Sequence, residues 1–322
     1  MNEVDNNLSN NDFGDEIDIR EIFSVLSQGK KIIIYITGLL SIIGIIYSLL
    51  LPNIYESKAL LSPVEEDSSL TGALSNYGGL AALAGISLPS GTNDSNSIKA
   101  IEMMDSLSFF ENNLLPKIFL PDLMAVDYWD QKTNSLIYDD GIFDSSSNSW
   151  VREYSYPKKL IPSAQESFEA FEEEHFKISE NKTSGFITLS VRHQSPFIAK
   201  KWVETVVEEI NTFYRQKDKS DSEKTVAYLN EQMLKTNLSE VKKVTAELLQ
   251  REIQKLALVE VNEDYVFEYI YPAIAMEKKS EPSRLLIVII FTLLGAILSI
   301  SIVLLKHYFF TKQKDEAGRI TS

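Results

Sequence analysis

The chain has 322 residues, with 46 acidic and 31 basic side chains and a formal charge of −15. The absence of cysteine excludes disulfide frameworks, thiolate metal sites and cysteine nucleophiles. An acidic chain lacks the basic excess that neutralises phosphates, so we expect no nucleic-acid partner.

Residues 1–31 are predicted to form an N-terminal tail that begins as a polar, acidic, disordered segment. A short amphipathic segment follows. It either lies on the inner membrane face or extends the first membrane helix. Its apolar residues are Ile17, Ile22, Phe23, Val25 and Leu26.

Two stretches, residues 32–51 and 285–305, contain no charged side chain. Each has the roughly 20 residues that cross about 30 Å of hydrocarbon as a helix, so we predict two transmembrane helices. The first stretch lacks the short basic leader and small-residue cleavage site of a secretory signal. We therefore expect it to be an uncleaved anchor.

Basic residues near the span ends predict the orientation. Seven lie on the terminal sides: Arg20, Lys30, Lys31, Lys306, Lys312, Lys314 and Arg319. Four lie on the inner side: Lys58, Lys278, Lys279 and Arg284. Because Lys and Arg favour the cytoplasmic side, both termini (1–31 and 306–322) are predicted to be cytoplasmic. Residues 52–284 are then periplasmic, in the inner membrane of a bacterium.

Small residues share one face of each predicted span. Ser41, Gly44 and Ser48 lie on one face of the first, and Gly295 and Ser299 repeat the spacing in the second. Such faces let helices approach closely in lipid, and we expect them to contribute to contacts between subunits. The alternative is that Gly and Ser are simply common in membrane helices.

Residues 52–284 are predicted to form one α+β domain with a base near the membrane and a long helical arm. Strands are expected at 55–62 and 265–275, which meet in the base, and as a hairpin between 176 and 193. A glycine-rich loop, 71–91, precedes a helix at 97–115. Ser163 and Glu166 form a capping box. The core residues expected on the 97–115 helix are Ile98, Ile101, Met104, Leu107 and Phe110.

The predicted arm, about residues 196–260, lies in a stretch without glycine or proline and carries one apolar stripe. A continuous helix would be about 97 Å long. Capping boxes at Ser220–Glu223 and Asn237–Glu240 offer places where it doubles back, and both versions stay open. The stripe is expected to pack against neighbouring arms. Its residues are Leu229, Met233, Leu238, Val241, Val244, Leu248, Ile253 and Leu256.

No nucleotide loop, serine-nucleophile motif or metal-ligand spacing occurs in the sequence. His175, His193 and His307 are isolated in sequence, and the acidic pairs fit solvated surfaces. We therefore predict no catalytic residue, no cofactor and no metal site, and no enzyme activity. Trp129 and Trp150 are either sugar contacts or core residues.

The order and spacing of several short segments resemble those of one known family, the bacterial Wzz-type chain-length determinants, also called polysaccharide co-polymerases. The resemblance covers nearly the whole chain and includes the glycine-rich loop. It rests on residues 18–22, 51–57, 129–130, 138–139, 150–152 and 162–166 and on the segment from Tyr271 to Arg284. That last segment contains Pro272 and Pro282, which match the family's proline-containing approach to the second span.

The resemblance implies an inner-membrane homo-oligomer with an α/β base and a long periplasmic helix. Members of that family act with a Wzy-type polymerase and set the modal length of O-antigen or a related polysaccharide, without catalysing a reaction. The implied partners are further copies of the chain, that polymerase, membrane lipid and the growing polysaccharide. Two other hypotheses stay open: an adaptor that activates a separate cytoplasmic tyrosine kinase in capsule or exopolysaccharide export, and a two-span sensory receptor.

Overall fold

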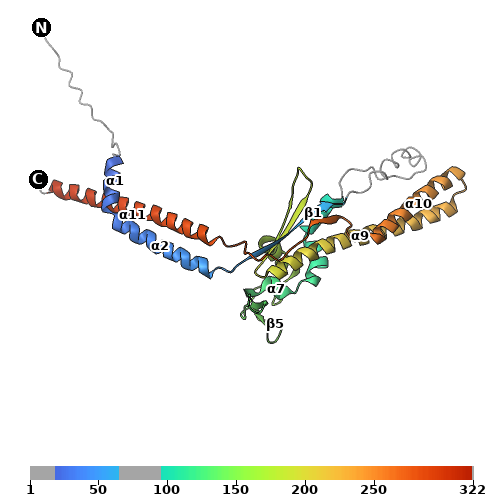
Figure 1. Cartoon of the computed structure of the whole chain (residues 1–322), viewed down its shortest axis with the longest axis horizontal. Coiled ribbons are helices and arrows are strands. Elements are labelled where there is room, and N and C mark those ends of the chain that lie inside the picture. Colours follow the sequence, from blue (N-terminus) through green and yellow to red (C-terminus); the bar gives the residue numbers. More distant parts are fainter. Residues whose placement is uncertain (1–18, 65–95, 321–322) are drawn as a thin grey trace, which may run out of the picture. The chain divides into compact units, whose positions relative to one another are not determined.

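The computed structural model describes residues 19–64 and 96–320, and the chain divides into two compact units (Figure 1). One unit comprises Met1–Pro52 and Pro282–Ser322, and the other comprises Asn53–Glu281. The predictions for the start of the N-terminal tail and for the glycine-rich loop, 71–91, lie outside the described residues.

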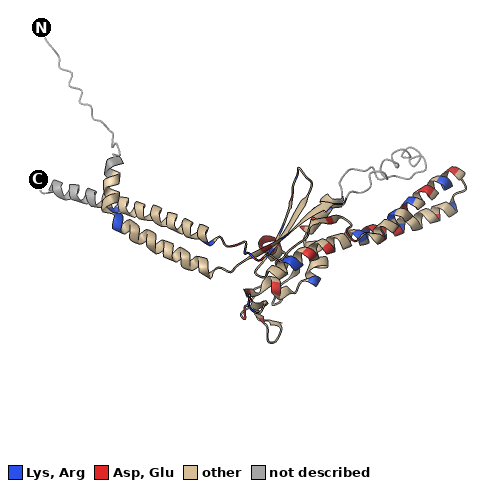
Figure 2. Cartoon of the chain, in the orientation of Figure 1, with Lys and Arg blue, Asp and Glu red and all other residues tan. Residues whose placement is uncertain are grey.

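The first unit consists of helices α1 (Ile19–Gln28), α2 (Lys30–Leu50) and α11 (Arg284–Ile320). Helix α2 and the Arg284–Phe309 part of α11 are long and apolar enough to cross a membrane, and charges lie only near their ends (Figure 2). Helix α1 is separate from α2, with Gly29 between them, so the amphipathic segment does not simply extend the span.

The second unit is built on a four-stranded antiparallel sheet in the order β6-β7-β1-β8. Its strands are β6 (Phe176–Glu180), β7 (Ile187–His193), β1 (Tyr55–Pro63) and β8 (Phe267–Tyr271). The predicted meeting of first and last strands is confirmed, because β1 pairs with β8 and Ile54 bridges Glu281. Strand β8 is shorter than predicted, since Pro272 follows it and has no N–H for the ladder.

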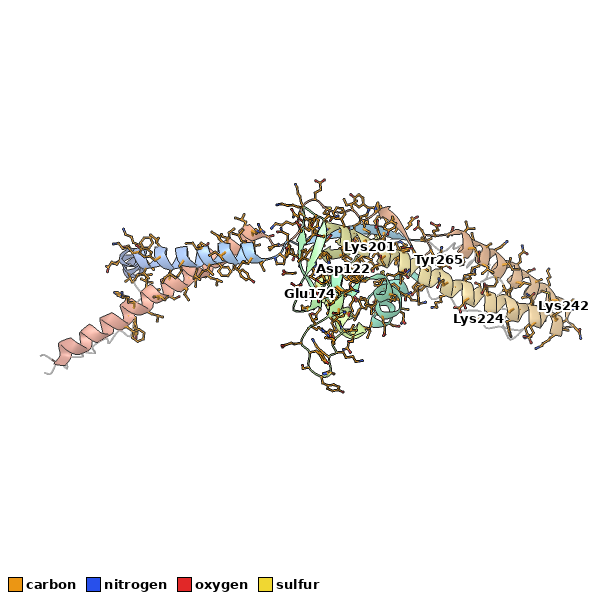
Figure 3. The ribbon with its side chains drawn as sticks, turned by 90° about the horizontal axis from the view of Figure 1, so that it is seen from below. Asp122, Glu174, Lys201, Lys224, Lys242 and Tyr265 are labelled. Carbon is orange, nitrogen blue, oxygen red and sulfur yellow. The ribbon has the colours of Figure 1, made fainter. Side chains whose placement is uncertain are left out.

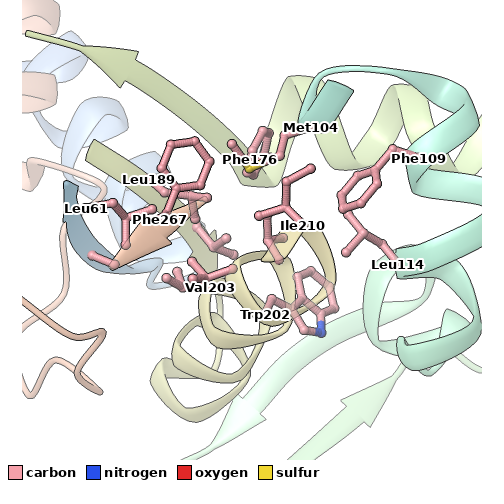
Figure 4. Packing of buried hydrophobic residues seen from close by; sticks show 14 of the residues in the cluster. Leu61, Met104, Phe109, Leu114, Phe176, Leu189, Trp202, Val203, Ile210 and Phe267 are labelled. Carbon is pink, nitrogen blue, oxygen red and sulfur yellow. The ribbon is translucent and has the colours of Figure 1, made fainter. Parts of the chain in front are cut away.

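One face of the sheet packs against the first half of helix α9 (Pro196–Lys235) to form the core (Figure 4). Alternate residues of β7 point into this core, as its period-two pattern predicts. The buried side chains of α9 recur every three or four positions, so they share one face of the helix. The buried residues of these two elements are Ile187, Leu189, Val191, Ala199, Trp202, Val203, Val206, Val207, Ile210 and Tyr214.

The helix expected at 97–115 is broken into short pieces: α5 (Asn96–Met104), α6 (Leu107–Phe109), η1 (Phe110–Leu114) and η2 (Leu115–Lys117). Ser106 causes the break, because its hydroxyl accepts the Phe109 N–H (3.3 Å) and starts a new helix. The new helix changes which side chains face inward. Met104 and Phe110 are buried as predicted, whereas Ile98 and Leu107 are exposed, contrary to prediction.

Short elements connect this region to the sheet. They are α7 (Leu120–Met124), the hairpins β2–β3 (Val126–Asp130, Ser135–Tyr138) and β4–β5 (Phe143–Asp144, Ser149–Trp150), α8 (Ala164–Ala170) and η3 (Phe171–His175). Ser163 caps α8 by accepting the Glu166 N–H at 3.2 Å, which confirms the predicted cap.

The arm doubles back. The second half of α9 packs along α10 (Ser239–Val261), and residues 236–238 form the turn. The predicted break at Ser220 does not occur. Near Asn237 the break does occur, but Leu238 rather than Asn237 is the N-cap residue and no side chain caps α10. At about 1.5 Å per residue, the 40-residue α9 is about 60 Å long instead of about 97 Å.

Candidate functional site

The small residues of the two spans lie in the contact between α2 and α11 within one chain. Gly44, Ser48 and Ser299 are buried there. A Cβ atom added to Gly44 would lie 2.7 Å from Phe291 Cβ, and one added to Gly295 would lie 3.1 Å from Thr37 Cα. Side chains at these glycines would therefore push the helices apart.

Hydroxyl groups cross the same contact. The Ser41 and Thr292 hydroxyl oxygens are 2.8 Å apart, and those of Thr37 and Ser299 are 3.4 Å apart. Each hydroxyl has one proton, so one partner of a pair donates across the contact while the other can bond a carbonyl of its own helix. These pairs link the two helices in one register, and in lipid such bonds between helices would have no water to compete with them.

This arrangement changes the interpretation of the span residues. The sequence predicts close helix contacts at Gly44 and Gly295, and the structure has such contacts. The partner, however, is the other span of the same chain, so these faces are already occupied and are not free for a neighbouring subunit.

Pro272 and Pro282 flank the segment that leads towards the second span. Pro272 is exposed and follows the last residue of β8. Pro282 follows Glu281, whose carbonyl accepts the Ile54 N–H at 3.0 Å. The two prolines thus mark the ends of a non-helical connection between β8 and α11.

The apolar stripe of the arm is used mostly inside the hairpin. Leu229 is buried, and five members are half-buried: Met233, Val241, Val244, Leu248 and Leu256. Leu238 and Ile253 are exposed, with 63% and 51% of their surface accessible. The stripe therefore mainly holds α9 against α10, and within the stripe only Leu238 and Ile253 face outward.

Asn211, which the sequence does not single out, joins the arm helix to strand β8. Its amide oxygen accepts the N–H groups of Val266 and Phe267, and its amide nitrogen donates to the Phe267 carbonyl, all at 2.9 Å. Further out, the Tyr265 hydroxyl donates to Asp218 at 2.7 Å and Lys219 pairs with Glu260. Figure 3 shows Tyr265 where the base meets the arm, and Lys224 and Lys242 along the arm.

A buried polar centre lies at the start of α9. The Ser195 N–H donates to His193 Nδ1 at 2.9 Å, so the ring proton is on Nε2, which donates to the Asp122 carbonyl at 2.9 Å. The His175 ring stacks on His193 with centroids 5.6 Å apart, and both rings contact Trp202. His175 and His193 are thus neighbours, which their sequence spacing does not reveal.

The ionisable groups of this centre are shifted towards their neutral forms. Burial lowers the pKa of His193 to about 4 and also lowers the pKa of His175. Burial raises the pKa of Asp122, although the Tyr138 hydroxyl donates to its carboxylate at 2.6 Å and the charge of Lys201 acts the other way. Figure 3 shows Asp122, Glu174 and Lys201 in the base, near one another. The centre joins α7, β7 and α9.

Trp129 and Trp150 are half-buried and packed among other aromatic rings. Trp129 contacts Tyr55 and Phe197, and its indole N–H donates to Asn134 at 3.1 Å. Trp150 lies 5.4 Å from the Phe143 ring. Both tryptophans therefore pack against neighbouring rings, but neither belongs to the buried core.

Arg152 holds the connection between β5 and α8. Its guanidinium forms a bidentate pair with Glu166 (2.5 and 2.8 Å) and donates to the carbonyls of Lys159 (2.5 Å) and Leu160 (2.9 Å). The guanidinium lowers the pKa of Glu166. In a capping box the Glu166 side chain would bond to the backbone N–H of Ser163. In the structure it pairs with Arg152 instead.

Within residues 19–64 and 96–320, no group of three or more His, Asp or Glu side chains is placed to hold a metal ion. What the structure does assemble is a set of packing surfaces: a close contact between two candidate membrane helices and a mixed domain with a two-helix arm. These features define the class as a protein with two candidate membrane helices and a large domain between them.

A sequence comparison matches part of the chain to a known family. Residues 15–114 match the family described as Wzz, chain length determinant protein, which confirms the predicted resemblance over that part of the chain. No curated protein matches the sequence.

Two solved structures are similar in outline. A full-length bacterial polysaccharide co-polymerase is 12% identical, with a TM-score of 0.40 over 92% of this chain and 99% of that one. A fragment of WzzB, a polysaccharide co-polymerase from Salmonella Typhimurium, is 14% identical, with a TM-score of 0.27 over 71% of this chain and 100% of that one. The likeness to the chain length determinant family is therefore taken from the match at residues 15–114.

Proposed function

We propose that this chain is a non-enzymatic polysaccharide co-polymerase of the bacterial inner membrane. It regulates the modal chain length of O-antigen lipopolysaccharide or a related surface polysaccharide, and it works as a homo-oligomeric scaffold with a Wzy-type polymerase. The single observation that carries this proposal is the match of residues 15–114 to the chain length determinant family.

The architecture supports a scaffold role. Two candidate membrane helices flank the whole mixed domain, and a two-helix arm extends from its core. The described residues form extended packing surfaces, which suits a protein that acts through its shape. In this proposal, both termini are cytoplasmic and residues 52–284 are periplasmic, as the distribution of Lys and Arg favours.

The outer surface of the arm supports assembly with further copies. Several large apolar side chains remain exposed on a helical hairpin that is otherwise highly charged (Figure 2). Such residues are costly to leave in water and are typical of interfaces. They are Tyr228, Leu234, Leu238, Ile253, Leu258 and Val261.

The test is a gel of surface polysaccharide from a deletion strain beside the parent and a complemented strain. We expect the modal cluster of chain lengths to become a random ladder, while polymer is still made. Loss of all polymer would contradict a regulatory role. An unchanged ladder would contradict length control and favour the capsule-adaptor or receptor hypothesis.

A further inference from the structure

The loop between β5 and α8 carries the most exposed aromatic side chain in the described residues. Tyr156 is 96% accessible and Tyr154 is 59% accessible. Every residue from 153 to 159 is exposed, so this segment contributes little to the core. We call residues 153–159 the clamped loop.

Several hydrogen bonds hold the two ends of the clamped loop together. Arg152, at its start, donates to the carbonyls of Lys159 and Leu160, at its end, and to both oxygens of Glu166. The Arg152 and Glu166 side chains are only 13% and 14% exposed, so water screens this pair weakly. Inside the loop, the Lys158 N–H donates to the Ser155 carbonyl at 2.9 Å.

A fixed loop that presents uncovered aromatic rings is suited to binding. Ordering a loop costs conformational entropy, and a loop that is ordered before binding no longer pays this cost when the ligand arrives. Tyrosine is enriched at interfaces because its ring is apolar while its hydroxyl can form a hydrogen bond. The structure thus combines a loop held at both ends with one ring that is almost fully accessible and a second that is more than half accessible.

The chemistry around the rings favours a saccharide. Polar side chains alternate with the tyrosines: Glu153, Ser155, Lys158 and Lys159. A pyranose ring has the matching character, with an apolar C–H face and a rim of hydroxyl groups, so it can lie on a tyrosine ring while its rim bonds to the neighbours. The centre of a protein interface is instead depleted of Lys and Glu.

The lysines indicate which saccharides fit best. The chain carries a charge of −15, and its acidic surface repels anions. The clamped loop departs from this balance, since it has two lysines and one glutamate. Lys158 already lies 3.5 Å from the Glu166 carboxylate, so the preference rests mainly on Lys159. Sugars with carboxylate groups would gain charge-assisted hydrogen bonds here.

We propose that the clamped loop, through Tyr154 and Tyr156, is a contact site for an extended polysaccharide, with a preference for acidic sugars. This inference deepens the proposed function and rests on it, because it assigns a place where the regulated polymer touches this chain. It also moves the sugar contact from the packed Trp129 and Trp150 to two tyrosines outside the aromatic clusters.

The first test is photocrosslinking in cells, with a benzophenone amino acid in place of Tyr156 in the full chain. A matched control carries it at Tyr228, a tyrosine of the arm that is 56% accessible. We expect a smeared adduct at position 156 that reacts with antiserum against the surface polysaccharide, and none at position 228. An adduct with lipid alone, an adduct with a protein alone, or no adduct would each overturn the proposal.

The second test measures binding of purified full chain in detergent to oligosaccharides cut from the cell's own surface polysaccharide. The Y154A/Y156A variant should raise Kd about tenfold, since each ring contributes a modest contact, whereas Y228A should leave Kd unchanged. An equal Kd for all three proteins overturns the proposal. With polygalacturonate oligomers as the probe, K159Q should weaken binding and K242Q should not, and an equal effect overturns the acidic preference.

The deletion experiment separates this inference from the proposed function. If the deletion strain loses its modal length but the Tyr156 crosslink is absent, only the contact site is wrong. If the ladder is unchanged in the deletion strain, the proposed function is wrong whatever the loop binds.

Discussion

At the residue scale, His193 couples acidity to the stability of the base. Its Nδ1 accepts the N–H of Ser195, the cap of α9, and its Nε2–H donates to Asp122, so the folded protein requires the neutral ring. The neighbouring groups are His175, Glu174, Arg192 and Lys201. A proton on Nδ1 would face the Ser195 N–H and remove a hydrogen bond at the start of the arm helix.

The pH dependence follows from the sign of the shift. The pKa of His193 is about 4 in the folded chain and 6.5 unshifted, so between these values the unfolded state binds more protons. Stability should therefore fall as pH drops from about 6.5 to about 4, by about 3 kcal/mol for this group. We expect unfolding of the full chain in detergent to show this slope and H193N to lose more than half of it. An unchanged slope in H193N would assign the effect to other groups.

Asn211 provides a second test at this scale. Truncation to alanine leaves two buried N–H groups and one carbonyl at β8 without their partner, and each such loss is costly. We expect N211A to lower the free energy of unfolding by about 3 kcal/mol. The control is N230A, an exposed asparagine of the same helix, which should change stability by less than about 0.5 kcal/mol. Similar values for both variants would show that the junction does not depend on Asn211.

At the element scale, the contact between α2 and α11 can be tested in a chain that has no native cysteine. The Ser41 and Thr292 hydroxyl oxygens are 2.8 Å apart, so S41C/T292C should form a disulfide within one chain and shift the monomer band on a non-reducing gel. Adding G44L should reduce crosslinking, because the new side chain meets Phe291. Adding G38L should not, since a Cβ there has no neighbour within 4 Å.

A disulfide-linked dimer in place of the shifted monomer would support the subunit contact that the sequence predicts. The same small residues would then face a second copy. Either product is informative, because both cysteines are introduced and no other thiol can react.

The elements also show what sequence alone can predict. Alternation in β7 and the length of the spans are local signals, and both agree with the structure. The sequence could not distinguish the doubled arm from a continuous helix. An apolar stripe packs equally well against a helix of the same chain and against a helix of another copy. For the same reason, Gly44 predicts a close helix but not which helix.

Side-chain surroundings were the least predictable part of the candidate site. Trp129 and Tyr156 are both aromatic residues in a turn-rich stretch, yet one is packed and the other is 96% accessible. Trp129 packs on Tyr55 and Phe197, and these contacts between distant parts of the chain arise only in the fold. The one local signal was the alternation of aromatic and polar residues from Glu153 to Lys159.

At the scale of the whole molecule, two crossings place both ends of the chain on one side of the membrane. The segment between α2 and α11 must then lie on the other side, and seven basic residues against four favour the cytoplasm for the ends. The proposed length control would require this orientation, because the arm would then lie on the side where the polymer grows.

Single cysteines can report this orientation, since the native chain has none. S239C, exposed at the start of α10, should react with a membrane-impermeant maleimide in cells whose outer membrane is permeabilised. S27C, exposed at the end of α1, should react only after the inner membrane is opened. The reverse pattern would place the arm in the cytoplasm, where it could not meet an exported polymer. Reaction of both cysteines before the inner membrane is opened would mean that α2 does not cross, and the scaffold would then need a different anchor.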